Sequence, residues 1–222
     1  MLKTFNYLMK FSMFIDLHNL HNCLNNKNIY MMMGDEMKSY KLIIIGDTGV
    51  GKTSITNKKC TGTFSIAVSP TVGTWHLKTT VAVADQTVEL KIWDTAGQEQ
   101  FASLVPMYAR GSQVCIIVGS FVDSLSIDHI NVWAERLHEA GEFPPIIVAI
   151  NKLDLAQNAL LTETQIREKI DPKYYDNLFF VSARSGDGLP ELFSAAAQEA
   201  TKYSKSEQER TKLVEKNKSS CC

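Results

Sequence analysis

Cysteine is scarce in this chain, which has five among 222 residues: Cys23, Cys60, Cys115, Cys221 and Cys222. Their number is odd and their positions are scattered, so they predict no disulfide framework. Cys115 lies inside the apolar run VCIIV, where a buried small hydrophobic residue is expected. The cysteine pattern therefore favours a protein of a reducing compartment.

An excess of charge of either sign is also missing. The 23 Lys and Arg residues nearly balance the 24 Asp and Glu residues, which leaves a formal net charge of -1. A protein that binds nucleic acid through a global basic surface needs a clear positive surplus. We therefore expect no nucleic-acid partner.

The N-terminal segment MLKTFNYLMKFSMFIDL lacks what a membrane span or a signal peptide needs. Lys10 and Asp16 interrupt it, it is too short to cross a bilayer, and no small-residue cleavage site follows. The Asn-rich stretch HNLHNCLNNKNIY has the composition of disorder. Methionines at 31, 32, 33 and 37 leave two alternatives open for residues 1–38, a disordered extension or a mis-annotated one upstream of the true start.

Regular patterns begin at Ser39. The runs YKLIIIG, VCIIVGSF and PIIVAIN are short and continuously apolar, as parallel strands covered on both faces require. The stretch LKTTVAVADQTVELKIWD has two alternating halves around Asp85 and Gln86, which predicts an antiparallel hairpin. The segments SLSIDHINVWAERLHEAG and GLPELFSAAAQEATKY have helical spacing of apolar residues.

This alternation of strands and helices predicts an α/β fold with a mostly parallel sheet covered on both faces. We expect one domain over residues 39–203 and a flexible polar tail over residues 204–222. In such folds ligands bind beyond the carboxyl ends of the strands, and each motif below follows a predicted strand.

The motif GDTGVGKT, residues 46–53, satisfies G-x-x-x-x-G-K-[ST] directly after a strand. Its glycines let backbone N–H groups wrap a phosphate, and the helix that follows adds its positive end. Lys52 is expected to reach the β- and γ-phosphates, and the Thr53 hydroxyl to bind Mg²⁺. A chance Gly-rich turn is disfavoured by this context. The predicted phosphate-binding residues are Gly46, Asp47, Thr48, Gly49, Val50, Gly51, Lys52, Thr53 and Ser54.

The motif NKLD, residues 151–154, identifies the base. The Asp154 carboxylate can accept from both N1–H and the amino group of guanine, whereas adenine offers an acceptor at N1. Asn151 is expected at the N7 edge, and the stem of Lys152 against the ring. An ordinary polar turn is the alternative, but its position downstream of a phosphate loop disfavours it.

The motif WDTAGQE closes the second half of the hairpin. Asp94 is expected to hold Mg²⁺ through water, and the Gly97 N–H can approach a γ-phosphate. Gln98 can accept from an attacking water and donate to the transferred group, which suits the positioning of the nucleophile.

Together these motifs resemble the Ras superfamily of small GTPases and, within it, the Rab family, over residues 39–200 and the tail. The resemblance implies a P-loop NTPase fold, with a six-stranded sheet, one antiparallel edge pair and five helices. SPTVG resembles switch I. The resemblance implies that the Thr71 hydroxyl binds Mg²⁺ and that the Thr71 backbone contacts the γ-phosphate. Phe64 stands where the family places an aromatic side chain against guanine. SAR, which comprises Ser182, Ala183 and Arg184, resembles the loop behind the base, and SLVPMY is similar to the endosomal subgroup.

The chain departs from the Rab pattern at four positions. His76 replaces a usual Phe, Gln100 an Arg, Ala109 a Tyr and Ser120 an Asp, whereas Trp93 and Tyr108 keep the aromatic anchors. None of these positions is expected to touch the phosphates or the base. His76, Gln100 and Ala109 are expected on or near the surface that partners read, so they bear on the identity of the partners.

The resemblance implies a GTP/GDP switch with Mg²⁺ that regulates vesicle trafficking and hydrolyses GTP slowly. No arginine of the switches is clearly placed to supply the missing cation, so we expect an activating protein to provide it. An exchange factor, a dissociation inhibitor or escort protein, and effectors are also implied. A GTP-binding scaffold with little hydrolysis is the alternative, which Gln98 and Thr71 disfavour. NKLD and the absence of a lid-like Arg cluster disfavour a P-loop kinase.

The chain ends in KNKSSCC. A C-a-a-X signal needs Cys fourth from the end, and that position is Ser219. Cys221 and Cys222 instead resemble the double-cysteine ending of Rab proteins, in which both thiols carry geranylgeranyl chains. Two chains anchor stably where one anchors reversibly. We therefore expect the protein on the cytoplasmic face of intracellular membranes, in the endosomal system, cycling with the cytosol; two free thiols are the alternative.

Overall fold

The chain divides at Met37, and Lys38–Cys222 forms a compact unit of its own. The computed structural model describes residues 37–65, 71, 74–84, 86–95, 104–139, 141, 143–159 and 161–219. The extension expected over residues 1–38 lies outside these residues except for its last two positions.

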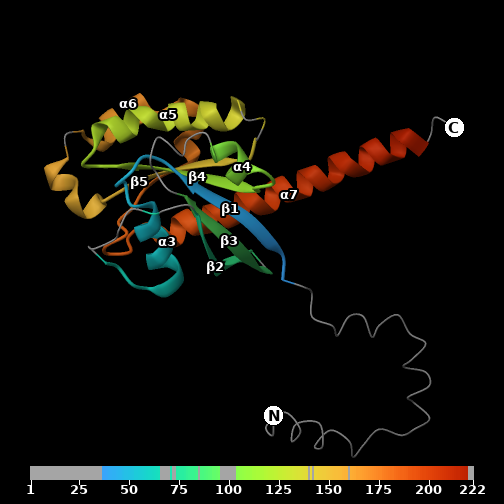
Figure 1. Ribbon diagram of the computed structural model, residues 1–222, viewed down its shortest axis with the longest axis horizontal. Helices are drawn as coiled ribbons and strands as arrows, with labels where there is room; N and C mark the ends of the chain where they lie inside the picture. The colour runs from blue at the N-terminus through green and yellow to red at the C-terminus, as the bar shows by residue number, and fades with distance from the viewer. Residues whose placement is uncertain are drawn as a thin grey trace, which may run out of the picture. The chain divides into compact units, whose positions relative to one another are not determined.

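A six-stranded sheet forms the centre of the domain (Figure 1). Its spatial order is β2-β3-β1-β4-β5-β6; β2 and β3 pair antiparallel and every other neighbouring pair is parallel. The strands are β1 (Ser39–Ile45), β2 (Thr74–Val83), β3 (Gln86–Thr95), β4 (Val114–Ser120), β5 (Ile146–Asn151) and β6 (Leu178–Phe180). Because β4 and β5 are buried along their whole length, their continuous apolar runs correctly predicted central parallel strands. The predicted fold class and hairpin are confirmed.

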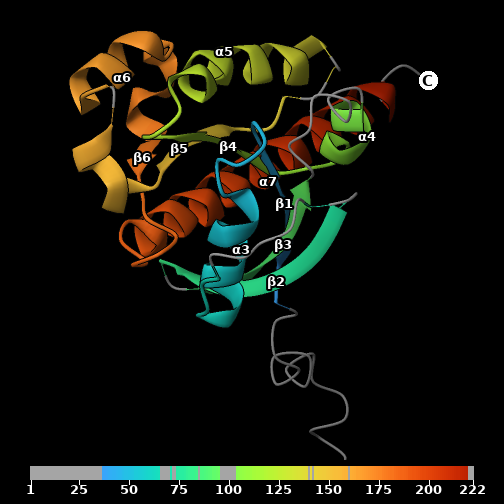
Figure 2. The ribbon, with the colours of Figure 1, turned by 60° about the vertical axis from the view of Figure 1, so that its left-hand side comes forward.

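Five α-helices cover the sheet within the described residues: α3 (Lys52–Thr61), α4 (Val105–Ala109), α5 (Ser124–Glu139), α6 (Glu163–Lys169) and α7 (Leu189–Ser219). Two short 3₁₀ helices, η3 (Leu153–Asn158) and η4 (Pro172–Asn177), connect the later elements. Figure 2 shows α3 and α7 on one side of the sheet and α5 and α6 on the other. Each side has its own apolar core, with Phe193 of α7 in one and Ile130 of α5 in the other. The two helices predicted from apolar spacing are confirmed as α5 and α7.

The C-terminal segment differs from the expectation of a flexible tail. α7 continues as one helix to Ser219, so residues 204–219 are helical. That stretch has no glycine or proline and consists mostly of strong helix formers, and ion pairs one turn apart link Lys202 to Glu199 and Arg210 to Glu207. The packed first half of α7 supplies the nucleus, so the polar half needs only propagation. No helix among the described residues combines the length and the hydropathy needed to cross a bilayer.

Candidate functional site

The loop between β1 and α3 is shaped by glycine backbone geometry. Gly51 is the N-cap of α3 with φ +98°, no side chain caps the helix, and its first turn contains no acidic residue. The first N–H groups of α3 therefore point into the loop without a side-chain acceptor. A ten-residue helix that begins in this way favours an anion at its N-terminus.

Lys52 spans this loop from the first turn of α3. Its Nζ donates to the carbonyl oxygens of Gly46 at 2.8 Å and Asp47 at 2.7 Å. Burial lowers the pKa of Lys52 to about 8, against the opposing negative charges of Asp94 and Asp47. A buried ammonium that is held by two carbonyl groups has donor capacity and charge to offer an incoming phosphate.

Two hydroxyls and one carboxylate lie beside Lys52. The Oγ1 atoms of Thr53 and Thr71 are 2.8 Å apart, which places the Thr71 hydroxyl beside the first turn of α3. Asp94 is almost fully buried on β3, and its Oδ1 has no hydrogen-bond partner among the described residues. Burial raises the pKa of Asp94, while the Thr53 hydroxyl and the Lys52 charge oppose that rise.

An unpartnered buried carboxylate oxygen is costly unless something neutralises or coordinates it. One carboxylate and two hydroxyls are hard oxygen donors, and Mg²⁺ typically takes one or two carboxylates together with phosphate oxygens and water. The described residues contain no cluster of three or more His, Cys, Asp or Glu side chains, so a metal held by protein carboxylates and imidazoles alone does not fit there. The residues present fit Mg²⁺ shared with a phosphate.

Asn151, at the end of β5, connects the phosphate loop to the predicted base-binding loop. Its Nδ2 donates to the Val50 carbonyl at 2.9 Å, and its Oδ1 accepts from the Ala183 N–H at 3.0 Å. Sequence reasoning expected Asn151 at the edge of the base and did not foresee this bridging role. One N–H of its amide is not used in these two bonds and can serve the base.

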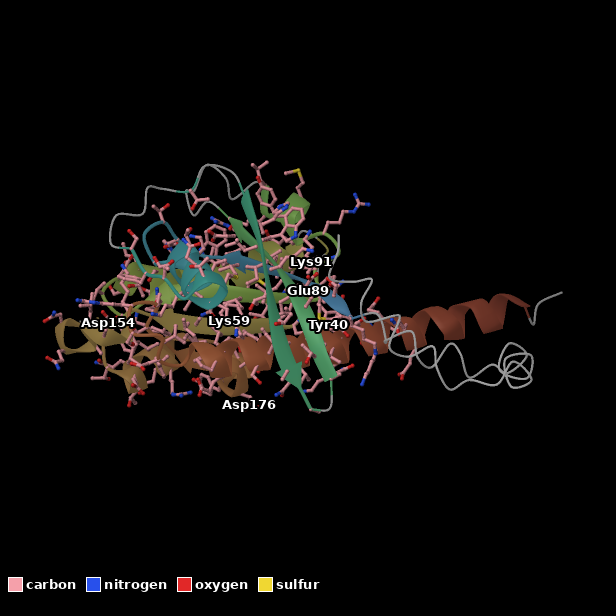
Figure 3. The ribbon with its side chains drawn as sticks, turned by 90° about the horizontal axis from the view of Figure 1, so that it is seen from below. Tyr40, Lys59, Glu89, Lys91, Asp154 and Asp176 are labelled. Atoms are coloured by element: carbon pink, nitrogen blue, oxygen red, sulfur yellow. The ribbon has the colours of Figure 1, made fainter. Side chains whose placement is uncertain are left out.

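Asp154 lies at the start of η3 and is labelled in Figure 3. Side chains of the loop between β6 and α7 orient its carboxylate. The Ser182 hydroxyl donates to its Oδ1 at 2.6 Å, and Arg184 Nη1 lies 3.8 Å from its Oδ2. The residue before η3, Lys152, has φ +67°, a left-handed conformation that is uncommon for a side chain of this size. Such strain often marks functional loops, and here it sets the direction in which the NKLD segment leaves β5.

The structure thus brings the predicted phosphate and base residues to one end of the sheet, where β1, β3 and β5 have their carboxyl ends. Phe64 lies beyond the end of α3 with 37% exposure. Gly97 and Gln98, the rest of SPTVG around Thr71, and Cys221 with Cys222 lie outside the described residues. Their roles stay predictions.

The contacts of the Asp47 side chain with α5 were not predicted from the sequence. Its Oδ2 lies 2.6 Å from His129 Nδ1, and its Oδ1 accepts from Trp133 Nε1 at 2.7 Å. Both partners are on α5, four residues apart, and therefore share one helix face. Through these two contacts, the Asp47 side chain holds the phosphate loop against α5. The i, i+4 spacing of His129 and Trp133 indicates that both side chains share one helix face. The sequence gives no indication that this face contacts Asp47.

Gly46→Ala is expected to destabilise the fold at this loop. A Cβ there would lie 2.3 Å from the backbone oxygen of Val118, and φ is +136°. Because a buried β4 backbone cannot yield, we expect a loss of about 3–5 kcal/mol in the free energy of unfolding, measured by urea denaturation. Gly62→Ala is the control, since its φ is also positive but its Cβ would meet nothing within 4 Å. That variant should lose only about 1 kcal/mol, and equal losses would contradict the close approach.

Comparisons with known proteins give the family of the chain. Comparison with protein-family models matches residues 41–202 to the Ras family. Two curated relatives, the Ras-related proteins Rab-7a and Rab-7b of Paramecium octaurelia, are each 32% identical to the chain over 182 residues. Each match covers 80% of this chain and 88% of the relative. With its phosphate loop, its NKLD segment and its six-stranded sheet, the chain belongs to the Rab family of small GTPases within the Ras family.

Proposed function

We propose that this GTPase is a Mg²⁺-dependent switch that hydrolyses GTP slowly by itself and is anchored to an intracellular membrane. The observation that carries the proposal is the buried oxygen of Asp94 without a partner, beside the Thr53–Thr71 hydroxyl pair and the Lys52 ammonium. These groups provide one cation and three hard oxygen ligands at the N-terminus of a helix, as the terminal phosphates of a nucleotide with Mg²⁺ require.

Thr53, Thr71 and Asp94 would hold the metal, Asp94 through water. When bound, Mg²⁺ neutralises charge on the phosphate oxygens. Lys52 binds the β- and γ-phosphates, and the N–H groups of residues 46–53 orient them. Gln98 positions the attacking water, and the Gly97 N–H approaches the γ-phosphate when GTP is bound. The sequence of the switch segments contains no arginine clearly placed to neutralise the remaining charge, so efficient hydrolysis requires a cation from a partner.

The switching step follows from the position of Thr71. Thr71 precedes β2, and its only described link to the phosphate side is the 2.8 Å hydroxyl contact with Thr53. A bound γ-phosphate and its metal stabilise Thr71 in this position. When the γ-phosphate leaves after hydrolysis, this stabilisation is lost and Thr71 can move away. A scaffold with little hydrolysis remains the alternative, and it requires Gln98 to have no effect.

Asp94→Asn is expected to remove the dependence of nucleotide binding on Mg²⁺, because the neutral amide loses the charge that attracts the cation. In the wild type, chelation of Mg²⁺ should speed the release of fluorescent GDP by roughly tenfold or more. In the variant, release should already be fast and change little on chelation. Asp128→Asn, which removes a half-exposed α5 carboxylate paired with Lys169, is the matched control and should behave as the wild type. An unchanged chelation effect in Asp94→Asn would overturn the metal assignment.

For localisation we propose the cytosolic face of endosomal membranes, with cycling through the cytosol. The support is the family, the similarity to the two Rab-7 proteins, and the Cys-Cys ending. A dissociation inhibitor or escort protein would cover the lipid chains during the cytosolic phase, and an exchange factor would reload GTP.

Replacement of Cys221 and Cys222 by Ser is expected to move the protein from membranes to the soluble fraction. Two prenyl chains make an anchor stable, and a chain without either has no lipid to insert. Fractionation of cells that express both forms measures the shift, and GTP binding should stay unchanged. Cys60→Ser is the control, because this thiol is half-buried in the domain. If the double variant stayed on membranes, the membrane anchor would have to lie in another part of the chain.

A further inference from the structure

Side-chain hydrogen bonds hold the phosphate loop between β1 and α3 in place. Lys52 Nζ donates to the carbonyl oxygens of Gly46 and Asp47, and Asn151 Nδ2 donates to the Val50 carbonyl. A further contact joins the Asp47 side chain to α5, which covers the opposite side of the sheet from α3 (Figure 2). Lys52 and Asn151 belong to the two motifs that are expected to bind the nucleotide, whereas α5 belongs to neither motif.

Both oxygens of the Asp47 carboxylate have a donor on α5. Oδ2 lies 2.6 Å from His129 Nδ1, and Oδ1 accepts from Trp133 Nε1 at 2.7 Å. An ionised carboxylate only accepts hydrogen bonds, so Nδ1 of His129 carries the hydrogen in this contact. Distances this short are typical of hydrogen bonds to a charged acceptor, which are stronger than neutral ones. The two donors therefore fix both the position and the direction of the Asp47 side chain.

The two donors differ in how firmly they are held. Trp133 is only 4% exposed and packs in the apolar core with Ile130 and Leu137. A side chain that packing holds in one orientation is a precise support for a site. The His129 side chain is 43% exposed, so water weakens its contact with Asp47. Trp133 is therefore the stronger of the two supports.

The helix does not need this contact for its own position. Ile127, Ile130 and Leu137 are almost fully buried against the sheet, and Asn131 makes two hydrogen bonds to the backbone at the end of α6. The loop does need support, because several of its residues are glycines with positive φ, whose ordering costs more entropy than that of other residues. The contact between Asp47 and α5 therefore acts mainly on the loop.

The contact also controls a negative charge at a phosphate-binding loop. Burial lowers the pKa of Lys52, and the charges of Asp94 and Asp47 oppose that effect, so the Asp47 carboxylate acts on the Lys52 ammonium. A carboxylate that was free to turn toward Lys52 would compete with a phosphate for the ammonium and for the N–H groups of the loop. His129 and Trp133 hold this carboxylate on the side of α5.

We propose that His129 and Trp133 are positioning residues for nucleotide binding, which act through Asp47 and slow the release of the nucleotide. The Asp47 carbonyl accepts from Lys52 while the Asp47 side chain accepts from α5, so a displacement of Asp47 displaces the Lys52 ammonium. This inference rests on the phosphate-binding role proposed for the loop. It adds to that site two side chains of a helix that belongs to neither nucleotide-binding motif.

The test is the release of fluorescent GDP from the full-length protein in the presence of Mg²⁺ and excess unlabelled GDP. Trp133→Phe keeps an aromatic ring in the core but removes the indole N–H, and it should release GDP about tenfold faster than the wild type. His129→Leu should release GDP about threefold faster, because its contact is half-exposed. His129→Asn places an amide nitrogen near the position of Nδ1, and it should restore most of the wild-type rate.

Two further measurements separate positioning from a loss of packing. In an Asp47→Ala background, which should itself release GDP fast, neither α5 substitution should have a further effect. In NMR spectra of the full-length ¹⁵N-labelled protein, the Trp133 indole signal is the one of three that Trp133→Phe removes. That signal should shift in Asp47→Ala, because its carboxylate acceptor is lost.

Asn131→Leu is the matched control. This substitution also removes hydrogen bonds of α5, but they lead to the end of α6 and not to the phosphate loop. The variant should have a lower Tm than the wild type and the same rate of GDP release. Because His129 is half-exposed, its variants are expected to fold and to decide the test even if Trp133→Phe does not fold.

Wild-type release in both Trp133→Phe and His129→Leu would overturn the proposal. Equal acceleration by Asn131→Leu would also overturn it, as would an undiminished effect of His129→Leu in the Asp47→Ala background. A wild-type protein that did not retain GDP would overturn the proposed nucleotide site together with this inference. Retention of GDP by the wild type with unchanged release from the α5 variants would overturn this inference alone, so the two failures are distinguishable.

Discussion

Asp154→Asn is expected to lower the affinity for GDP and GTP by about 10²–10³ and to raise the affinity for xanthine nucleotides. The carboxylate accepts from two guanine donors, and an amide in its place presents an N–H group to one of them. Xanthine has a carbonyl in place of the exocyclic amino group, so the Asn amide can donate to it. Displacement of fluorescent GDP and XDP from the purified proteins measures both changes.

The control for this prediction is Asp187→Asn. Asp187 belongs to the loop between β6 and α7 that also contains Ser182, and it accepts from the Ser185 hydroxyl at 2.6 Å, but it is not in the NKLD segment. The same loss in both variants would mean that the loop had collapsed rather than that base recognition had changed. An Asp154→Asn protein that still preferred guanine over xanthine would contradict the assignment of this carboxylate to the base.

Gln98→Leu is expected to abolish most of the partner-stimulated hydrolysis while it leaves GTP affinity similar. The leucine is close in size but can neither accept from the attacking water nor donate to the transferred group. The stimulation that an activating protein gives, typically 10³–10⁵-fold, should fall by at least about 10²-fold in single-turnover assays. Gln198→Leu, an exposed position on α7, is the matched control. Hydrolysis at the wild-type rate in Gln98→Leu with the partner present would refute the proposed role and favour a different source of water positioning.

The strands and the phosphate loop could be predicted because their signals are local. The run KLIII followed by GDTGVGKT, residues 41–53, contains both the burial pattern and the backbone geometry that the site needs. The continuation of α7 beyond residue 203 was not foreseen, because that segment is polar and has no apolar periodicity. Propensity is sufficient there, since the packed half of the helix already provides the nucleus.

The links between distant segments could not be predicted in the same way. Asn151 bonds to Val50 and Ala183, which are 101 and 32 residues away along the chain. The Asp47 bonds to His129 and Trp133 likewise depend on where α5 packs. The position of Lys91 opposite both Lys41 and Lys78 likewise exists only in the register of three strands, and a shift of one residue would move each lysine to the opposite face.

Binding selectivity of the wild-type full-length protein tests the central claim, a site built for guanine nucleotides with Mg²⁺, most directly. The measurement is equilibrium competition of unlabelled GDP and ADP against fluorescent GDP, in the presence of Mg²⁺. The combination of Asp154, oriented by Ser182, with the Lys52 loop predicts that ADP needs at least about 10³-fold higher concentration than GDP for half displacement. Equal competition by ADP and GDP would contradict the account.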